Sequence, residues 1–190
     1  MIWLILGLLL FLGVHSVRIV AEGWRDSRIA SIGINKWKGI YSLLAIAGFV
    51  LLIWGYGQAK ADAPTLLWMP PPGLRHAAAL LTLPAFILVV AAYVPRNHFK
   101  AWLGHPMVFG VILWAVAHLL VNGWLHGVVL FGSFLVWAAL DYRAARRREP
   151  PAHGGGTWMG TALSLLIGIA AWAAFAFYLH ARWIGVAPFG

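Results

Sequence analysis

Long apolar runs constrain this chain more than any other feature. A helix that crosses a bilayer needs about 20 predominantly apolar residues. Six runs of roughly that size, bounded by charged residues, proline or glycine, lie at residues 2–21, 37–56, 74–94, 106–122, 124–140 and 159–181. Backbone polar groups within a bilayer must be satisfied inside the segment, so such runs form helices. The sequence therefore predicts an all-α fold: one integral-membrane domain over residues 1–190, a polytopic bundle of about six transmembrane helices.

The composition excludes a soluble globular domain. Hydrophobic residues make up 62% of the chain and charged residues only 10%, whereas a soluble domain is about 25% charged. A net charge of +9 can indicate nucleic-acid binding, but this chain has too few polar residues to build such an interface. We therefore expect the lipid bilayer, and not nucleic acid, as its principal partner.

The distribution of Lys and Arg predicts the orientation in the membrane, because short cytoplasmic loops carry the excess of these residues. Eleven of them fall in the loops after the first, third and fifth runs or at the run ends beside these loops, and three, Lys60, Arg75 and Arg182, fall on the other side. We expect a multi-pass protein of the bacterial inner membrane with both termini in the periplasm. The first run has no basic segment before it and no small-residue cleavage site, which favours a retained helix over a signal peptide.

Two histidines inside predicted spans are the strongest candidates for a functional site. An ionisable residue within a spanning helix is costly and usually faces the bundle interior. His15 lies in the first run, and His118 lies in the fourth, where it shares a helix face with Trp114 and Asn122. The chain has no cysteine, and its five acidic residues fall at span ends or in loops. Imidazole is therefore the available ligand for haem iron or another borderline metal.

A single intramembrane histidine is as often a structural residue, which donates a hydrogen bond to a neighbouring helix, as it is a functional one. Two of them on separate helices favour ligation, whereas the missing carboxylates argue against a dedicated zinc or di-iron site. At about 1.5 Å per residue, His15 lies about 21 Å from the periplasmic start of its helix and His118 about 20 Å from its cytoplasmic start. In a core of about 30 Å the two differ in depth by roughly 10 Å, which a tilted porphyrin can accommodate.

The other histidines are weaker candidates. His76, beside Arg75 at the start of the third run, lies nearer to His118 in depth and is the substitute ligand. His105 precedes Pro106 at the start of the fourth run, where it caps the helix or faces water, and is a second alternative. We assign no chemistry to four histidines that border loops or close a span: His98, His126, His153 and His180.

Small residues and one proline give packing expectations. Gly123/Gly127 and Gly156/Gly160 are spaced four apart, which predicts close approach of helices. Pro84 predicts a bend in the third span or a freed carbonyl. The segment 57–73, rich in proline and with Trp68, is typical of an interfacial loop.

Motifs spread over nearly the whole chain carry a family resemblance. They are Gly13-Val14-His15-Ser16, His105-Pro106-Met107-Val108-Phe109-Gly110, Leu113-Trp114-Ala115-Val116-Ala117-His118, Asn122-Gly123 and Gly185-Val186-Ala187-Pro188-Phe189. With them the sequence resembles the NnrU family of bacterial membrane proteins, which is similar to the plant zeta-carotene isomerase. The resemblance implies a haem b inside the bundle with His15 and His118 as axial ligands, and it suggests a context of nitrite or nitric oxide respiration.

The resemblance to the isomerase implies redox-gated haem chemistry on a polyene. The isomerase carries a cysteine where this chain has Ala115, so exchange with a thiolate ligand is excluded here. We expect a haem protein with isomerase-like or redox activity, in which Trp114 and Phe11 pack near the macrocycle and Arg18 or Arg75 neutralises the propionates. An open iron site would take an apolar polyene or a small diatomic ligand. A closed pair would limit the protein to sensing or to electron transfer with a redox partner.

Other functions rank lower. The main alternative is a haem-free assembly or interaction protein that supports a nitric oxide or nitrite reductase. The His-Pro-x-x-x-Gly stretch from His105 is also similar to membrane methyltransferases, but Gly104 replaces their arginine and no acidic pair is found. A small-molecule transporter ranks low because the chain lacks inverted-repeat signs and intramembrane acids.

Overall fold

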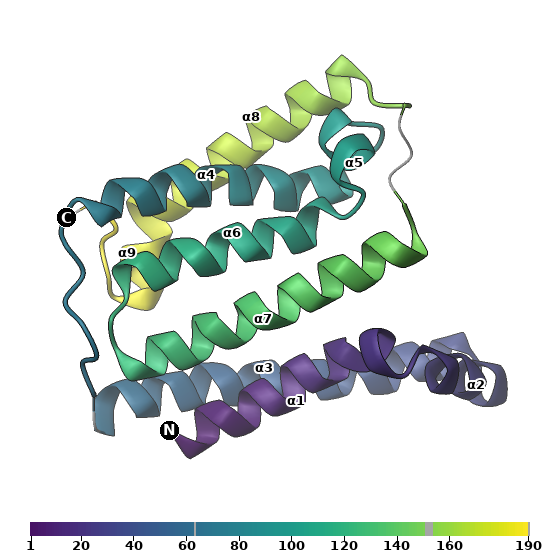
Figure 1. The fold of residues 1–190 in the computed structure, drawn as a ribbon, viewed down its shortest axis with the longest axis horizontal. Coiled ribbons are helices and arrows are strands. Elements are labelled where there is room, and N and C mark those ends of the chain that lie inside the picture. The colour runs from purple at the N-terminus through teal and green to yellow at the C-terminus, as the bar shows by residue number, and fades with distance from the viewer. Residues whose placement is uncertain (63, 151–153, 190) are drawn as a thin grey trace. The chain divides into compact units, whose positions relative to one another are not determined.

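The computed structural model describes residues 1–62, 64–150 and 154–189, which are predominantly helical (Figure 1). The helices are α1 (Ile2–Val20), α2 (Glu22–Ile32), α3 (Ile34–Asp62), α4 (Leu74–Tyr93), α5 (His98–Leu103), α6 (Pro106–Val121), α7 (Leu125–Arg148), α8 (Trp158–Ala174), the π-helical turn η1 (Phe175–Leu179) and α9 (His180–Ile184). Two units are distinguished by their internal contacts. Unit 1 comprises Met1–Trp68 and Gly123–Trp137, and unit 2 comprises Met69–Asn122 and Ala138–Gly190. Helix α7 contributes its first half to unit 1 and its second half to unit 2.

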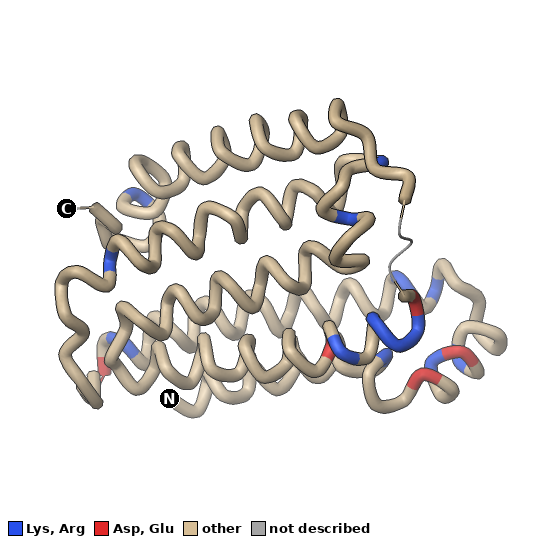
Figure 2. The backbone as a smooth tube through the Cα atoms, turned by 45° about the horizontal axis from the view of Figure 1, so that its top comes forward, with Lys and Arg blue, Asp and Glu red and all other residues tan. Residues whose placement is uncertain are grey.

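Five helical segments are long and apolar enough to cross a membrane: α1, α3, α4, α7 and the run Trp158–Ile184 formed by α8, η1 and α9. Helix α6 is apolar but has only 16 residues, about 24 Å at 1.5 Å per residue. The predicted all-α, polytopic membrane bundle is confirmed. Figure 2 shows the same pattern in the charges, since the central turns of α1, α3, α4 and α6 carry neither Lys, Arg, Asp nor Glu.

Two helices extend beyond the apolar runs that predicted them. The run at 37–56 belongs to the helix Ile34–Asp62, and the run at 124–140 belongs to the helix Leu125–Arg148. Apolar composition marks the part of a helix that suits the bilayer core, whereas the helix itself continues into polar sequence as long as its backbone hydrogen bonds are made. Residues 57–62 are therefore helical, although we expected an interfacial loop there.

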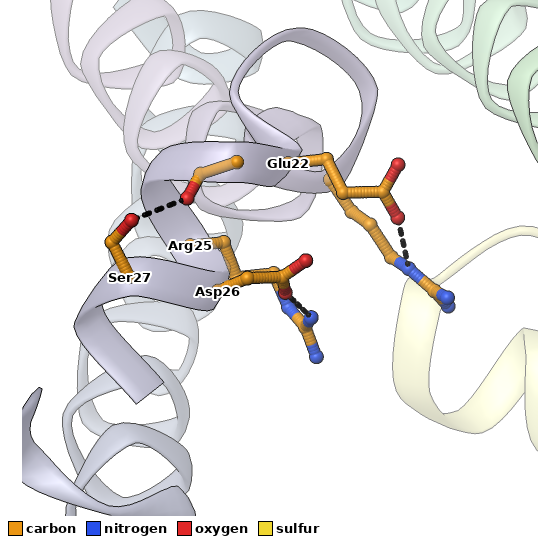
Figure 3. A network of polar contacts seen from close by, with 6 residues as sticks. Glu22, Arg25, Asp26 and Ser27 are labelled. Carbon is orange, nitrogen blue, oxygen red and sulfur yellow. Dashed lines mark hydrogen bonds and ion pairs between the residues drawn. The ribbon is translucent and has the colours of Figure 1, made fainter. Parts of the chain in front are cut away.

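A polar helix, α2, lies between the first two spans, where the sequence predicted only a cationic loop. None of its 11 residues is buried. Two ion pairs lie at its start (Figure 3). Arg18 of α1 places Nε 3.3 Å from the Glu22 carboxylate, and the Arg25 guanidinium donates to the neighbouring Asp26 over 2.7 Å. Gly33, with φ of 85°, ends α2 and permits the turn into α3. Such a helix suits the membrane interface.

Unit 1 is built on the contact between α1 and α3. The two backbones approach closely at glycines, because a Cβ at Gly7 would meet the backbone of Leu52 and a Cβ at Gly48 would stand 2.7 Å from the backbone nitrogen of Phe11. The chain between α3 and α4 pairs with the start of α7: Leu67 N donates to Gly123 O over 2.8 Å. The backbone of Trp68 passes so close to Gly123 that a Cβ at position 123 would clash with it. The sequence had predicted a contact between helices at this glycine.

Unit 2 is organised around α4, which packs against both α6 and α8 (Figure 1). Gly110 of α6 and Gly168 of α8 permit these approaches, to Ala85 and Ile87 respectively. Helix α4 remains one helix through Pro84. The predicted small residue Gly160 approaches the carbonyls of residues 95 and 96 in the loop before α5, and not a helix.

Candidate functional site

His118 lies on α6 with its ring half-buried. Its Nδ1 donates to the carbonyl of Trp114, one turn earlier, over 2.7 Å, and the Trp114 ring lies 5.0 Å from the imidazole. When Nδ1 carries the proton of a neutral imidazole, Nε2 carries the lone pair. Metal-ligating histidines are oriented in this way by a carbonyl acceptor. In this tautomer the Trp114 carbonyl fixes the orientation of the His118 ring.

The structure brings a second histidine to His118, and it is one to which we assigned no chemistry. The ring centroid of His180, at the start of α9, lies 6.5 Å from that of His118, with the ring planes inclined by 23°. Its Nδ1 donates to the carbonyl of Val186 over 2.6 Å. Both rings belong to unit 2, and both have Nδ1 committed to a backbone carbonyl. We expected His180 only to mark the end of the last span, and its contact with His118 was not predicted.

His15 lies in unit 1 and repeats the arrangement of His118. Its Nδ1 donates to the carbonyl of Phe11, one turn earlier, over 2.6 Å, and the Phe11 ring lies 4.3 Å away. The rings of Tyr41 and Trp137 contact His15 at 5.4 Å and 6.0 Å. Both sequence-predicted ligands thus share one local design: an aromatic residue four positions earlier packs on the imidazole and supplies the carbonyl that orients it.

A pocket of about 230 Å³ opens beside His15. Its wall combines aromatic and cationic side chains with aliphatic ones, and is formed by Val14, His15, Val17, Arg18, Arg25, Ile34, Trp37, Lys38 and Tyr41. Nearby, the indole Nε1 of Trp137 is buried and has no hydrogen-bond acceptor within the described part of the chain. This environment suits a ligand that has both apolar surface and anionic or acceptor groups.

The residues predicted to neutralise propionates are on the surface of their units. Arg18 pairs with Glu22 at 3.3 Å, with both side chains partly exposed. Arg75 and His76 are exposed on the first turn of α4. Of the predicted set, Arg18 therefore lines a pocket, whereas Arg75 and the substitute ligand His76 lie at a helix end.

The remaining described histidines make structural contacts. His98 Nδ1 lies 2.8 Å from the hydroxyl of Thr161, and the His126 ring packs 5.1 Å from Tyr56. His105 occupies the N-cap position of α6 but makes no side-chain cap hydrogen bond. Its Nε2 instead lies 3.3 Å from the carbonyl of Glu149 in an exposed contact, so that of the two expectations only the capping of the helix is wrong. His153 lies outside the described residues.

No group of three or more His, Cys, Asp or Glu side chains converges among the described residues. The donor sets that the structure offers are therefore single imidazoles and the His118–His180 pair. A haem iron needs only axial ligands from the protein, because the porphyrin supplies the other four. The chemistry of this donor set fits a haem better than it fits a metal ion that takes all its ligands from the protein.

Comparison with known proteins places the whole sequence in one group. A family model described as NnrU protein matches residues 3–188. Searches of curated proteins and of solved structures found no match to this chain.

Proposed function

Because this chain belongs to the NnrU family, we propose that it is a multi-pass membrane protein that binds haem b with His118 as an axial ligand. One observation carries the proposal. His118 stands on an apolar helix, packed against Trp114, with Nδ1 bound to a carbonyl; Nε2 would then be the atom that binds the iron. The second ligand that the resemblance implies is His15, which has the same hydrogen bond and an aromatic neighbour of its own.

Other residues support the binding of such a group. The propionates of a haem are anionic, and Arg18, Arg25 and Lys38 line the pocket beside His15. The buried N–H of Trp137 offers a further donor. A bound haem supplies an iron that changes oxidation state and accepts an additional ligand when an axial position is open. The chain's own contribution is to orient the imidazoles and to exclude water with apolar and aromatic side chains.

The activity proposed is isomerase-like or redox chemistry connected with nitrite or nitric oxide respiration. It follows from the resemblance and from the absence of cysteine and of intramembrane carboxylates in the sequence. The proposed ligands at an open iron site are an apolar polyene or a small diatomic molecule. An electron donor would then be required as a redox partner.

The visible spectrum of the protein purified after expression with a haem precursor tests this function. We expect a Soret band, and sharpened α and β bands after reduction with dithionite. Carbon monoxide added to the reduced protein distinguishes an open axial position from a closed pair. A colourless protein from cells that load other haem proteins would instead indicate the haem-free assembly or interaction role.

We further propose that the protein resides in the bacterial inner membrane with both termini periplasmic, which places α2 in the cytoplasm. The chain has no cysteine, so single-cysteine variants report topology without background. In intact spheroplasts, Ser27→Cys on α2 is expected to resist a membrane-impermeant maleimide, and Asp62→Cys at the end of α3 is expected to react. Permeabilised cells, in which both must react, are the control. The reverse labelling pattern would contradict this orientation.

A further inference from the structure

The end of unit 2 at which α5 lies carries a dense group of cations. Together, the segments 93–105 and 138–150 hold six Lys and Arg residues and two acidic residues. Both segments belong to unit 2, and α5 packs against α4, α6 and the start of α8 (Figure 1). None of these cations takes part in the proposed haem site.

A rigid corner between α4 and α5 positions the first two of these cations, Arg96 and Lys100. Between them lies Asn97, which is buried. Its side-chain amide donates to the carbonyls of Ala91 and Val94 over 2.8 Å and 2.7 Å. Its Oδ1 accepts a hydrogen bond from Lys100 N over 2.8 Å. One buried side chain thus satisfies backbone groups at the end of α4 and at the start of α5.

Arg96 has an unusual backbone conformation. Its φ is 50°, and no other residue except glycine has a positive φ in the part of the chain that the structure describes. Glycine and asparagine adopt this conformation at lower cost, and residues held in it cluster at binding sites. The Arg96 carbonyl accepts from the backbone N–H and the hydroxyl of Thr157 over 2.6 Å and 2.9 Å. The backbone is therefore fixed, while the guanidinium of Arg96 is presented on the surface.

Two exposed tryptophans lie beside these cations. The rings of Trp102 on α5 and Trp158 at the start of α8 lie 5.7 Å and 4.6 Å from the ring of His98. Trp102 is 60% exposed and Trp158 is 77% exposed. In membrane proteins, tryptophan is enriched at the depth of the lipid headgroups. The two indoles therefore mark the headgroup level at this end of unit 2.

The last turns of α7 add cations to the same surface. Arg146 donates to the carbonyls of Trp102 and Leu103 over 3.4 Å each. These contacts hold the end of α7 against the end of α5. Arg143 and Arg147 lie one turn apart on α7, and both side chains are exposed.

We propose that this surface binds the headgroups of anionic phospholipids. It is called the α5 patch here and consists of six exposed residues: Arg96, Lys100, Trp102, Arg143, Arg147 and Trp158. The patch lies at the ends of α4, α7 and α8, which belong to segments that are apolar enough to cross a membrane. Its charge therefore meets the phosphates at their own depth in the bilayer. A zwitterionic headgroup also carries an ammonium group, which the patch repels.

Native mass spectrometry of the full chain, purified in a non-ionic detergent, tests the proposal with two lipids that have the same acyl chains. We expect the wild type to bind anionic phosphatidylglycerol more tightly than zwitterionic phosphatidylcholine. Each Lys or Arg near a membrane surface contributes roughly fivefold to the affinity for anionic lipid. The Arg96→Gln/Lys100→Gln variant is therefore expected to bind phosphatidylglycerol at least roughly tenfold more weakly, with its affinity for phosphatidylcholine unchanged.

Two further double variants locate the effect. Arg143→Gln/Arg147→Gln leaves the corner at Asn97 intact, and a similar loss of affinity in this variant shows that the first result does not come from misfolding. Arg28→Gln/Lys36→Gln is the matched control. It removes two exposed cations from unit 1, on the same predicted side of the membrane. Because the attraction falls off within a Debye length, the control is expected to keep the wild-type affinity within about twofold.

Three results would overturn the proposal. Equal affinities of the wild type for the two lipids would favour an acidic protein as the partner of the α5 patch. An equal loss in the control variant would assign the effect to net charge alone. Displacement of phosphatidylglycerol by glycerol phosphate at equal concentration would identify a soluble phosphate ester as the ligand. Each measurement is independent of haem content, so its failure leaves the proposed function intact.

Discussion

His118→Ala protein, expressed with a haem precursor and purified in detergent, is expected to carry at least roughly tenfold less haem than the wild type. His118 is the axial ligand on which the proposed function rests, so its removal weakens the site directly. The Trp114 carbonyl would also lose the imidazole that it orients at 2.7 Å. The ratio of Soret absorbance to protein concentration measures the effect.

Two further variants separate ligation from a general loss of structure. His98→Ala removes a half-buried histidine whose Nδ1 contacts the Thr161 hydroxyl at 2.8 Å, and it is expected to retain its haem. His118→Met keeps a ligand of similar reach and should retain haem with an altered spectrum. If monodisperse His118→Ala protein contained as much haem as the wild type, the proposal that His118 is an axial ligand would be refuted.

The spanning helices could be predicted because membrane insertion imposes one simple requirement, a long apolar run, that the sequence shows directly. Helix α2 could not be predicted in this way, because its residues have neither an apolar run nor a buried face. Helix α2 ends at Gly33, whose φ of 85° is rare for residues other than glycine. This glycine is the one signal in the sequence that marks the end of the helix. Local pairs such as Arg18–Glu22 link this helix to the end of α1.

The candidate site shows the same division. His15 and His118 could be identified because an ionisable residue within an apolar run is unusual in itself. His180 could not, because its position depends on a π-helical turn before it and on the return of the chain after Gly185. Neither feature has a periodic pattern in the sequence. The only signal was the terminal motif, which marked the region without indicating that it holds a histidine.

Helix packing was predicted from the wrong glycines. The four-residue spacing directed attention to Gly123 and Gly160, which approach loop backbone. The closest contact between spans in unit 1 uses glycines of α1 and α3, and on α3 the buried positions Gly48, Leu52, Gly55 and Ala59 alternate in steps of four, three and four. This spacing keeps one face toward α1 along the helix. Gly55 and Ala59 are also small residues four apart, but a search restricted to pairs of glycines overlooks them.

The Gly48→Val substitution is therefore expected to separate α1 from α3. A Cβ at Gly48 would stand 2.7 Å from the backbone nitrogen and 2.9 Å from the Cα of Phe11, and backbone atoms cannot move aside as a flexible side chain can. We expect the free energy of unfolding to fall by roughly 3 kcal/mol, at the upper end of the cost of overpacking, and the melting temperature in detergent to fall by roughly 6–12 °C.

Gly57→Val on the same helix is the matched control, because a Cβ there would meet no atom within 4 Å. Both substitutions replace glycine by the same β-branched residue in α3, so the change in helix propensity is shared and the difference between them reports the contact with α1. Equal melting temperatures for the two variants would show that the α1–α3 contact does not require the close approach at Gly48. A low melting temperature for Gly48→Val alone would establish that the backbone of His15's helix is positioned by direct contact with α3.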